Sequence, residues 1–272
     1  YTLRAAAGAP AMTGNAIHHK VQQQFGQNPE GYVTSAAHAQ GSELPRMVEL
    51  VQPGAGWRAL DVATGGGHTA RTFAPHVQHI IAADLTFKML LAARGHFAAH
   101  DLSNLSLHQL DAQALPYAAG CFDLVTCRIA PHHFPDPAQF VIEAARVTRP
   151  GGIVAVVDQI MPEQRKAAQY VNAFERLRDP SHAWAYSLPR WLRFFEAAGL
   201  DVWHTEMVSR RHTLGSWAER MHCAPEVVTR LHVMLVQAPE PALAWMEPEL
   251  PQSGDASFFI RQALILGRKT SS

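Results

Sequence analysis

Short apolar runs alternate with helical patterns between residues 57 and 158, and this alternation restricts the fold more than any other feature of the chain. The apolar runs are expected to be buried strands: Trp57–Val62, Gln78–Asp84, Leu105–Leu110, Phe122–Arg128 and Ile153–Asp158. Three stretches between them are expected to be helices: His68–His76, Thr86–Ala98 and Asp136–Val147. Strands joined by helices form βαβ units, so the pattern predicts an α/β fold with a mostly parallel sheet.

The regular alternation of strand and helix patterns ends after residue 158. Two further strands are expected, at Leu200–Val208 and Phe258–Leu266, and prolines 239, 241, 248 and 251 predict a loop. Further helices are expected at Gln164–Arg178, Pro189–Ala198, Leu214–Met221 and Pro225–Val236. We interpret residues 15–272 as a single domain whose segments 15–52, 160–188 and 212–252 are cap elements over one sheet. Residues 1–14 are expected to be a disordered or cloning-derived terminus.

Composition excludes several classes of protein. The 272 residues include 23 Lys and Arg against 23 Asp and Glu, so no nucleic acid partner is expected, because phosphate binding needs a basic surface. No run of about 18 apolar residues occurs, so membrane insertion is not expected. Cys121, Cys127 and Cys223 form no CxxC pair, which argues against disulfides and a structural metal and favours a cytoplasmic location.

The first expected strand runs into a glycine-rich turn, Asp61-Val62-Ala63-Thr64-Gly65-Gly66-Gly67-His68, and then into a helix. Glycines let the backbone approach a ligand closely, and the start of a helix offers free N–H groups. Residues 65–70 also fit the loose pattern G-x-G-x-x-A. The turn therefore indicates a cofactor site, and the alternative is a tight turn that binds nothing.

Two acidic residues refine this prediction. Asp84 ends the next strand, 19 residues after Gly65, where a carboxylate can accept both hydroxyls of an adenosine ribose. Asp61 lies just before the glycines, where it would repel a pyrophosphate and attract an ammonium group. This favours S-adenosylmethionine over a nicotinamide dinucleotide. For Asp84, a cap on the following helix is the alternative role.

These motifs resemble those of the class I S-adenosylmethionine-dependent methyltransferases, in particular the small-molecule enzymes that include the ubiquinone and menaquinone C-methyltransferases. The first motif matches at Asp61, Gly65 and Gly67, and Ala63 stands where the family usually has a glycine. Further matches are Asp84-Leu85-Thr86-Phe87-Lys88-Met89, Asp111-Ala112, Phe122–Arg128 and Arg149-Pro150-Gly151-Gly152. The resemblance implies a Rossmann-like sheet of seven strands in the order 3-2-1-4-5-7-6, with Phe258–Leu266 as the antiparallel strand 7.

The resemblance also implies which residues bind the cofactor. Asp84 would bind the ribose, Met89 would pack against the adenine, and Asp111 with Ala112 would hold the adenine edge. Tyr32 belongs to a segment that covers the cofactor in related enzymes, and ordinary packing is its alternative role. The full predicted set is Asp61, Ala63, Gly65, Gly67, His68, Asp84, Leu85, Met89, Asp111, Ala112, Arg128 and Tyr32. Because alanine is the smallest replacement for glycine, we expect binding to survive at Ala63.

Histidines follow the fourth expected strand, at the sheet edge where ligands bind in such folds. His132 and His133 are the candidate catalytic residues, because imidazole suits proton transfer near neutral pH. The alternative is that both only shape the loop; adjacent histidines are not spaced like a zinc site, so no metal is expected. Asp158 and the cluster of Asp179-Pro180-Ser181-His182 with Trp184 and Tyr186 are candidates for the substrate cleft. Arg210-Arg211-His212 is interpreted as a solvated face.

The sequence thus predicts S-adenosylmethionine-dependent methyl transfer to a small-molecule acceptor by a monomer or homodimer. A non-catalytic protein that binds the same cofactor and an NAD-dependent enzyme of the same fold are the alternatives. A nucleic acid base methyltransferase is disfavoured, because Cys127-Arg128-Ile129-Ala130 stands where such enzymes carry Asn/Asp-Pro-Pro-Tyr/Phe.

Overall fold

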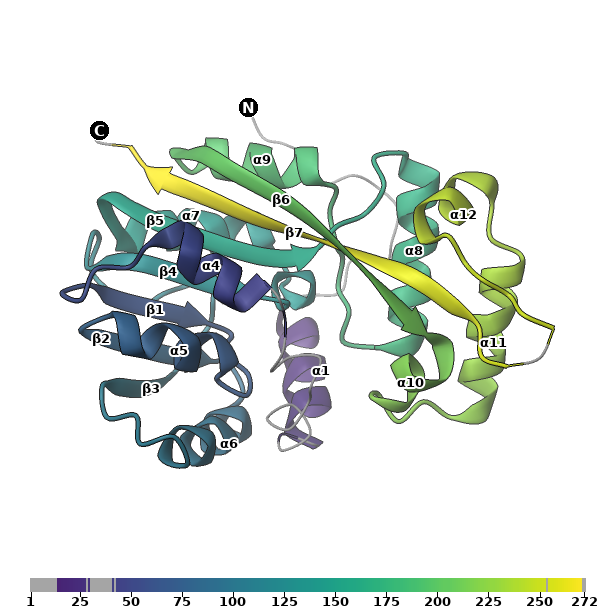
Figure 1. Ribbon diagram of the computed structural model, residues 1–272, viewed down its shortest axis with the longest axis horizontal. Coiled ribbons are helices and arrows are strands. Elements are labelled where there is room, and N and C mark those ends of the chain that lie inside the picture. The colour runs from purple at the N-terminus through teal and green to yellow at the C-terminus, as the bar shows by residue number, and fades with distance from the viewer. Residues whose placement is uncertain (1–13, 28, 30–40, 42, 253, 271–272) are drawn as a thin grey trace.

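The protein is built on one seven-stranded sheet, seen in a computed structural model that describes residues 14–27, 29, 41, 43–252 and 254–270 (Figure 1). The strands lie in the order β3-β2-β1-β4-β5-β7-β6, which confirms the expected order. Neighbours from β3 to β5 pair in parallel, and β7 pairs antiparallel with both β5 and β6, as expected. The strands are β1 (Arg58–Val62), β2 (His79–Asp84), β3 (Leu105–Gln109), β4 (Phe122–Arg128), β5 (Thr148–Gln159), β6 (Leu200–Thr213) and β7 (Ser257–Lys269).

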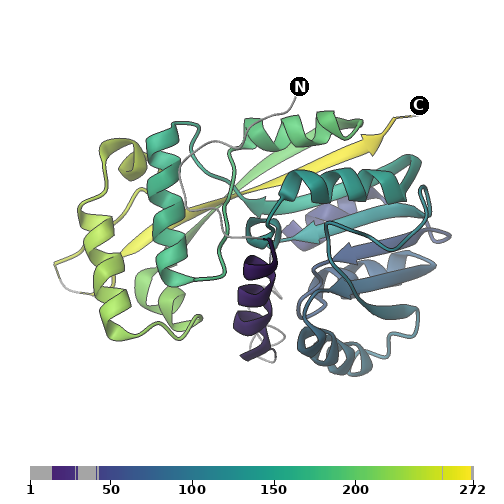
Figure 2. The same ribbon diagram turned by 180° about the vertical axis from the view of Figure 1, so that it is seen from behind.

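Helices cover both faces of the sheet (Figures 1 and 2). One face carries α4 (Glu43–Val51), α5 (His68–Phe73) and α6 (Phe87–Ala98), which share an apolar cluster with the strands. The other face carries α7 (Pro137–Val147) and α9 (Leu188–Ala197), which belong to a second cluster. Because both faces are covered, β2, β4 and the second half of β5 are almost continuously buried, whereas the edge strands β3 and β6 carry many polar residues.

The start of α7 shows how local sequence fixes an element. Asp136 is the N-cap, and its side chain accepts hydrogen bonds from the backbone N–H of Ala138 (3.0 Å) and Gln139 (3.2 Å). Pro137 occupies the first helical turn, where its missing N–H costs nothing. A capped start of this kind places the preceding loop, which contains the short 3-10 turn Pro131–His133, at the carboxyl end of β4.

A second group of helices packs at the far end of the long ribbon formed by β6 and β7 (Figure 1). It comprises α8 (Arg165–Arg178), α10 (Leu214–Glu219), α11 (Pro225–Val236) and α12 (Glu240–Met246), which share a third apolar cluster with Phe258 of β7. Trp217 stacks on Phe174 with ring centroids 5.0 Å apart. We call these four helices the cap. Helix α1 (Gly14–Gln27) lies between the cap and the helices of the first face (Figures 1 and 2).

Three elements differ from the sequence predictions. Arg149–Gly152, which fall between the expected helix Asp136–Val147 and the expected strand Ile153–Asp158, lie within β5, where a register shift against β4 between Phe122 and Leu124 accommodates them. β6 continues to Thr213 because it pairs with β7 over its whole length. The proline-rich stretch expected as a loop contains α12, since Pro241 sits in the first turn, where proline is tolerated.

Two predictions concern residues that the structure does not describe. Residues 1–13, which make up nearly all of the expected terminus, and Tyr32 lie outside the described residues. Within the described part of the chain, no helix combines the length and the apolar character needed to cross a bilayer.

Candidate active site

A pocket opens at the carboxyl ends of β1, β2 and β4. These strands pair in register, with Val62 beside Ala83 and Cys127, so they end at a common edge. The pocket has a volume of about 170 Å³ and is also lined by side chains of α1 and by Arg178 and Asp179 at the end of α8. It therefore lies where ligands bind in doubly wound sheets, between the sheet edge and the cap.

The glycine turn contributes backbone to this pocket. Ala63 (φ 53°) and Gly65 (φ 55°) adopt left-handed conformations, and both line the pocket together with Gly66. Gly67 (φ 83°) is not among the lining residues. A Cβ at Gly67 would lie 2.5 Å from the ring of Phe97 in α6, so this glycine permits close packing of the turn against α6. Gly67 therefore has a packing role in the turn, and its predicted contact with the cofactor stays a prediction.

Asp61 is buried beneath the turn and does not line the pocket. Its two carboxylate oxygens accept hydrogen bonds from the hydroxyls of Thr64 (2.6 Å) and Thr126 (2.7 Å). Burial raises the pKa of this carboxyl to about 6, although both hydrogen bonds and the nearby Arg128 oppose the shift. Asp61 therefore joins β1, the turn and β4 and places a negative charge just behind the pocket.

Asp84 lines the pocket and binds the backbone on both sides. One oxygen accepts a hydrogen bond from Gly65 N (3.0 Å), and the other accepts one from Thr86 N (2.8 Å) at the start of α6. Burial raises the pKa of the Asp84 carboxyl to about 6. Thr86 is the N-cap residue of α6, so this contact holds the backbone just before the helix and does not cap its first turn. The Asp84 side chain stays at the pocket wall.

Four further residues of the predicted cofactor set line the same side of the pocket: Leu85, Met89, Asp111 and Ala112. Asp111 accepts a hydrogen bond from Gln113 N (2.9 Å) and lies 3.7 Å from His18 Nε2 of α1. His68 and Arg128, also predicted, line the pocket next to the turn. The sequence motifs therefore come together around one cavity, with apolar and carboxylate groups side by side.

The two candidate catalytic histidines are buried in the 3-10 turn after β4 and line the pocket. His132 Nδ1 donates a hydrogen bond to Asp158 Oδ1 (2.5 Å). Burial alone would lower the pKa of His132, but the charge of Asp158 and this hydrogen bond outweigh burial, so the pKa is raised overall. His133 Nδ1 donates to the carbonyl of Ser181 (3.1 Å). Burial and the neighbouring His132 lower the pKa of His133 to about 4. The two imidazoles thus differ strongly in basicity.

Comparisons with known proteins bear on this site. A family described as "Methyltransferase domain" matches residues 60–156, which include the glycine turn, Asp84 and Asp111. The uncharacterized methyltransferase YcgJ of Bacillus subtilis is 33% identical over 246 residues, which cover 90% of this chain and 97% of YcgJ. This chain belongs to the methyltransferase family. As a methyltransferase it is an enzyme, and its sheet order is that of the Rossmann-like members.

Solved structures agree with this assignment. The crystal structure of YcgJ matches the methyltransferase with a TM-score of 0.81 at 32% identity, covering 84% of this chain and 98% of YcgJ. A structure of protein BH2331 from Bacillus halodurans gives a TM-score of 0.82 at 33% identity, covering 85% of this chain and all of that protein. The malonyl-acyl-carrier protein O-methyltransferase of Salmonella typhimurium is 31% identical over 196 residues, 68% of this chain and 73% of that protein.

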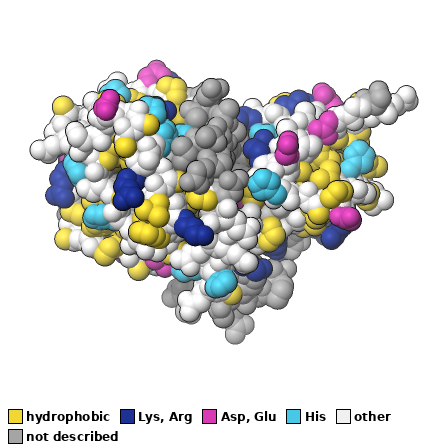
Figure 3. Space-filling view, turned by 90° about the horizontal axis from the view of Figure 1, so that it is seen from below, with side chains coloured by type: hydrophobic (Ala, Val, Ile, Leu, Met, Phe, Trp, Pro, Cys, Tyr) yellow, Lys and Arg dark blue, Asp and Glu magenta, His cyan; other side chains and the backbone are white. Residues whose placement is uncertain are grey.

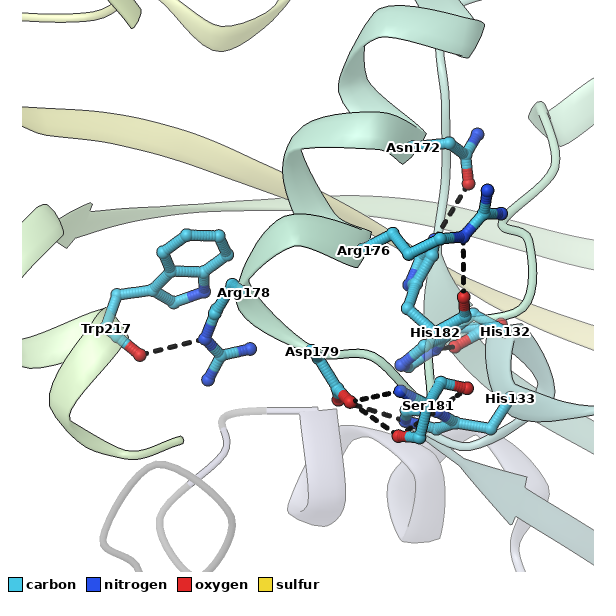
Figure 4. A network of polar contacts seen from close by, with 10 residues as sticks. His132, His133, Asn172, Arg176, Arg178, Asp179, Ser181, His182 and Trp217 are labelled. Atoms are coloured by element: carbon cyan, nitrogen blue, oxygen red, sulfur yellow. Dashed lines mark hydrogen bonds and ion pairs between the residues drawn. The ribbon is translucent and has the colours of Figure 1, made fainter. Parts of the chain in front are cut away.

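A polar cluster on the cap side closes the methyltransferase pocket (Figure 4). The carboxylate of Asp179 accepts hydrogen bonds from Ser181 N (2.9 Å) and Ser181 Oγ (2.5 Å). His182 donates from Nε2 to Asn172 Oδ1 (2.8 Å) of α8. Asp179 lines the pocket, whereas Trp184 and Tyr186, predicted with it, do not. Tyr186 instead packs edge-on against Phe194 of α9.

A buried charge network connects α4 with β4 and β6, and it shows that one prediction was wrong. Glu43 of α4 accepts a hydrogen bond from Arg128 Nη1 (2.8 Å) and also binds Arg210 of β6. Arg210 was expected on a solvated face, but the burial of Glu43 among these strands draws its guanidinium inward. Sequence spacing carries no signal for this contact, because Glu43 and Arg210 are 167 residues apart.

Proposed function

We propose that this methyltransferase transfers a methyl group from S-adenosylmethionine to a small-molecule acceptor. The observation that carries the proposal is the pocket at the carboxyl edge of β1, β2 and β4, where Asp84 and Asp111 lie beside the backbone of the glycine turn. Two carboxylates next to an exposed turn suit a ligand that carries hydroxyl and amino donors. A phosphate-rich ligand is less suited to this wall.

Each predicted residue except Gly67 has a role in this proposal. The Asp84 oxygens, each with a free lone pair besides its backbone hydrogen bond, accept the two ribose hydroxyls. Asp111 and Ala112 bind the adenine edge, and Leu85 with Met89 packs on the adenine. The backbone at Ala63 and Gly65, the side chains of His68 and Arg128, and the charge of Asp61 surround the methionine part. Tyr32 stays a prediction for the same part.

The chemistry demands alignment more than activation. When bound, S-adenosylmethionine presents its methyl group on a sulfonium, which is a good leaving group. The protein aligns the acceptor with that methyl carbon and excludes water. Where the acceptor must lose a proton, His132 accepts it: Asp158 holds Nδ1, so Nε2 is directed to the acceptor. His133, whose pKa is about 4, is the weaker base and serves to hold the Ser181 loop.

Two other functions compete with this proposal. An NAD-dependent enzyme needs room for a pyrophosphate at the turn, and the buried charge of Asp61 opposes this. A protein that binds the cofactor without catalysis would need no base in the pocket, so the hydrogen-bonded pair of His132 and Asp158 favours catalysis. We further propose that the enzyme acts in the cytoplasm as a monomer or homodimer, where its three free cysteines stay reduced.

Calorimetry with S-adenosylhomocysteine, the demethylated product, tests the proposal. The wild type is expected to bind it, and Asp84→Ala is expected to weaken binding by about 1.5–3 kcal/mol, the range for a hydrogen bond to a charged group. Since only the ionised carboxylate accepts both hydroxyls, affinity is expected to fall as the pH drops below about 6, the pKa of Asp84 in the free enzyme. Asp84→Asn removes this contribution to the pH dependence.

The matched control is Asp201→Ala, which removes an exposed carboxylate of β6 outside the pocket and is expected to leave affinity unchanged. NAD is titrated in parallel. Tight binding of NAD without any response to S-adenosylmethionine or its product would overturn the proposed cofactor. Equal affinity in the wild type and Asp84→Ala would remove the ribose contact from the proposal.

A further inference from the structure

Arg178 is the last residue of α8, and it projects from the cap into the wall of the pocket (Figure 4). Two contacts fix its guanidinium. Nε donates a hydrogen bond to the carbonyl of Trp217 (2.9 Å), and the guanidinium carbon lies 4.4 Å from the centre of the Trp217 ring. Trp217 is itself fully buried in the cap, so the position of the guanidinium is set by the cap core.

The two terminal nitrogens of Arg178 make no hydrogen bond or ion pair with any described residue. The adjacent carboxylate of Asp179 does not neutralise them, because it is bound by the backbone and hydroxyl of Ser181. In Figure 4 the Asp179 carboxylate points toward Ser181, and the Arg178 guanidinium lies on the other side of Asp179, next to Trp217. Arg178 thus holds a pair of charged donors ready at the pocket wall.

The surroundings of Arg178 are positively charged. Arg178 and Arg220 lie close to each other, near Glu175 and His212, whereas the guanidinium of Arg176 binds the carbonyls of His182 and Ala183. Burial raises the pKa of Glu175 to about 7, so it is only partly charged at neutral pH. Burial first, and the nearby arginines second, lower the pKa of His212 to about 4. The local field therefore favours an incoming anion.

We propose that Arg178 binds a carboxylate of the methyl acceptor through its two terminal nitrogens, which makes the acceptor of this enzyme an organic acid. The planar guanidinium presents parallel N–H groups that match the two oxygens of a carboxylate. Phe25 of α1 and Met221 line the same pocket and provide an apolar surface for the carbon skeleton next to the acid group. The inference rests on the proposed function, since it assigns the acceptor half of the same pocket.

The acceptor is anchored from the cap while its reacting atom faces the sheet edge. Arg178 enters from α8 and His132 from the turn after β4, so the two side chains line one cavity from different elements. An acid held by Arg178 then exposes a nucleophilic atom to His132. Arg178 is by this assignment a residue that determines specificity and orientation, and the proton transfer is left to His132.

Equilibrium dialysis with radiolabelled benzoate, measured on enzyme saturated with S-adenosylhomocysteine, tests the inference. Benzoate combines a carboxylate with an apolar ring, and benzamide is its neutral counterpart. The wild type is expected to bind benzoate at millimolar concentration and benzamide at least about tenfold more weakly. Arg178→Gln is expected to lose about tenfold or more in benzoate affinity, a change equivalent to about 1.4 kcal/mol. Arg178→Lys keeps the positive charge but lacks the paired donors, so its benzoate affinity is expected to lie between those of the wild type and Arg178→Gln.

Arg193→Gln is the matched control, because it removes an exposed arginine of α9 that does not line the pocket. Retained affinity for S-adenosylhomocysteine shows that each variant is folded. Equal benzoate binding by the wild type and Arg178→Gln, or no benzoate binding by a wild type that binds S-adenosylhomocysteine, would overturn the carboxylate assignment. A wild type that does not bind S-adenosylhomocysteine would instead overturn the proposed function, so the two failures are distinct.

Discussion

Replacement of Gly67 by alanine tests whether this residue packs the turn or binds the cofactor. The φ angle of 83° is unfavourable for any residue with a Cβ, and the added Cβ would lie 2.5 Å from two ring carbons of Phe97. Gly65 offers the matched comparison in the same turn. Its φ is 55°, but a Cβ there would meet only the terminal methyl of Met89, at an ordinary 3.7 Å.

The two substitutions therefore differ by a steric clash. A left-handed alanine costs about 1–2 kcal/mol in either position, and overpacking against the Phe97 ring adds about 1–3 kcal/mol at Gly67 alone. The free energy of unfolding is expected to fall by about 2–5 kcal/mol for Gly67→Ala and by about 1–2 kcal/mol for Gly65→Ala. Because only Gly65 lines the pocket, Gly65→Ala is expected to cause the larger loss of S-adenosylhomocysteine affinity.

Urea unfolding of both variants measures the stability loss, and Phe97→Leu in the Gly67→Ala background isolates the clash. Removing the ring should restore about 1–3 kcal/mol of the loss relative to the sum of the single variants. The reasoning is refuted if Gly67→Ala is no less stable than Gly65→Ala, or if the double-mutant cycle shows no coupling with Phe97.

Two other substitutions give further expectations. Ala63→Gly is expected to raise the free energy of unfolding by about 0.5–1 kcal/mol, because the relief of left-handed backbone strain exceeds the added conformational freedom of the unfolded chain. Urea unfolding measures this change, and a lower free energy of unfolding for Ala63→Gly would contradict the expectation. His132→Ala is expected to lower single-turnover methyl transfer by about 10²–10⁴-fold with cofactor affinity unchanged, and His133→Ala by much less. Labelled S-adenosylmethionine and an acceptor isolated from a metabolite extract provide the assay, and full activity of His132→Ala would show that alignment alone suffices.

The sheet could be predicted from sequence because its signals are local. Each strand from β1 to β4 is a short apolar run, and the turns between strands and helices contain glycine or a capping acid such as Asp136. The extra length of β6 and β7 could not be predicted, since each is stabilised by the other across more than 40 residues. Helix α12 was not predicted, because a proline such as Pro241 indicates a loop unless it is known to lie in the first turn of a helix.

The pocket could be predicted on the sheet side and only partly on the cap side. The residues on the sheet side, such as Asp84, directly follow strands. Their positions in the sequence therefore place them at the sheet edge. Arg178 lies beside a predicted cluster, but nothing in its neighbourhood shows that Trp217, 39 residues later, fixes its guanidinium. The close packing of Gly67 against the ring of Phe97, 30 residues later, could not be predicted from the sequence either.

The antiparallel pair β6 and β7 runs from the sheet into the cap and joins the two parts of the molecule (Figure 1), which Figure 3 shows from below. Helices α10, α11 and α12 are all inserted in the connection between these two strands, and β1 to β4, which carry the predicted cofactor residues, end before this insertion begins. On the face seen in Figure 3, acidic and basic side chains are dispersed over both parts. Exchange of the connection between Thr213 and Ser257 would thus replace most of the cap in a single genetic event and leave the glycine turn, Asp84 and Asp111 untouched, so that one methyl donor could serve many acceptors.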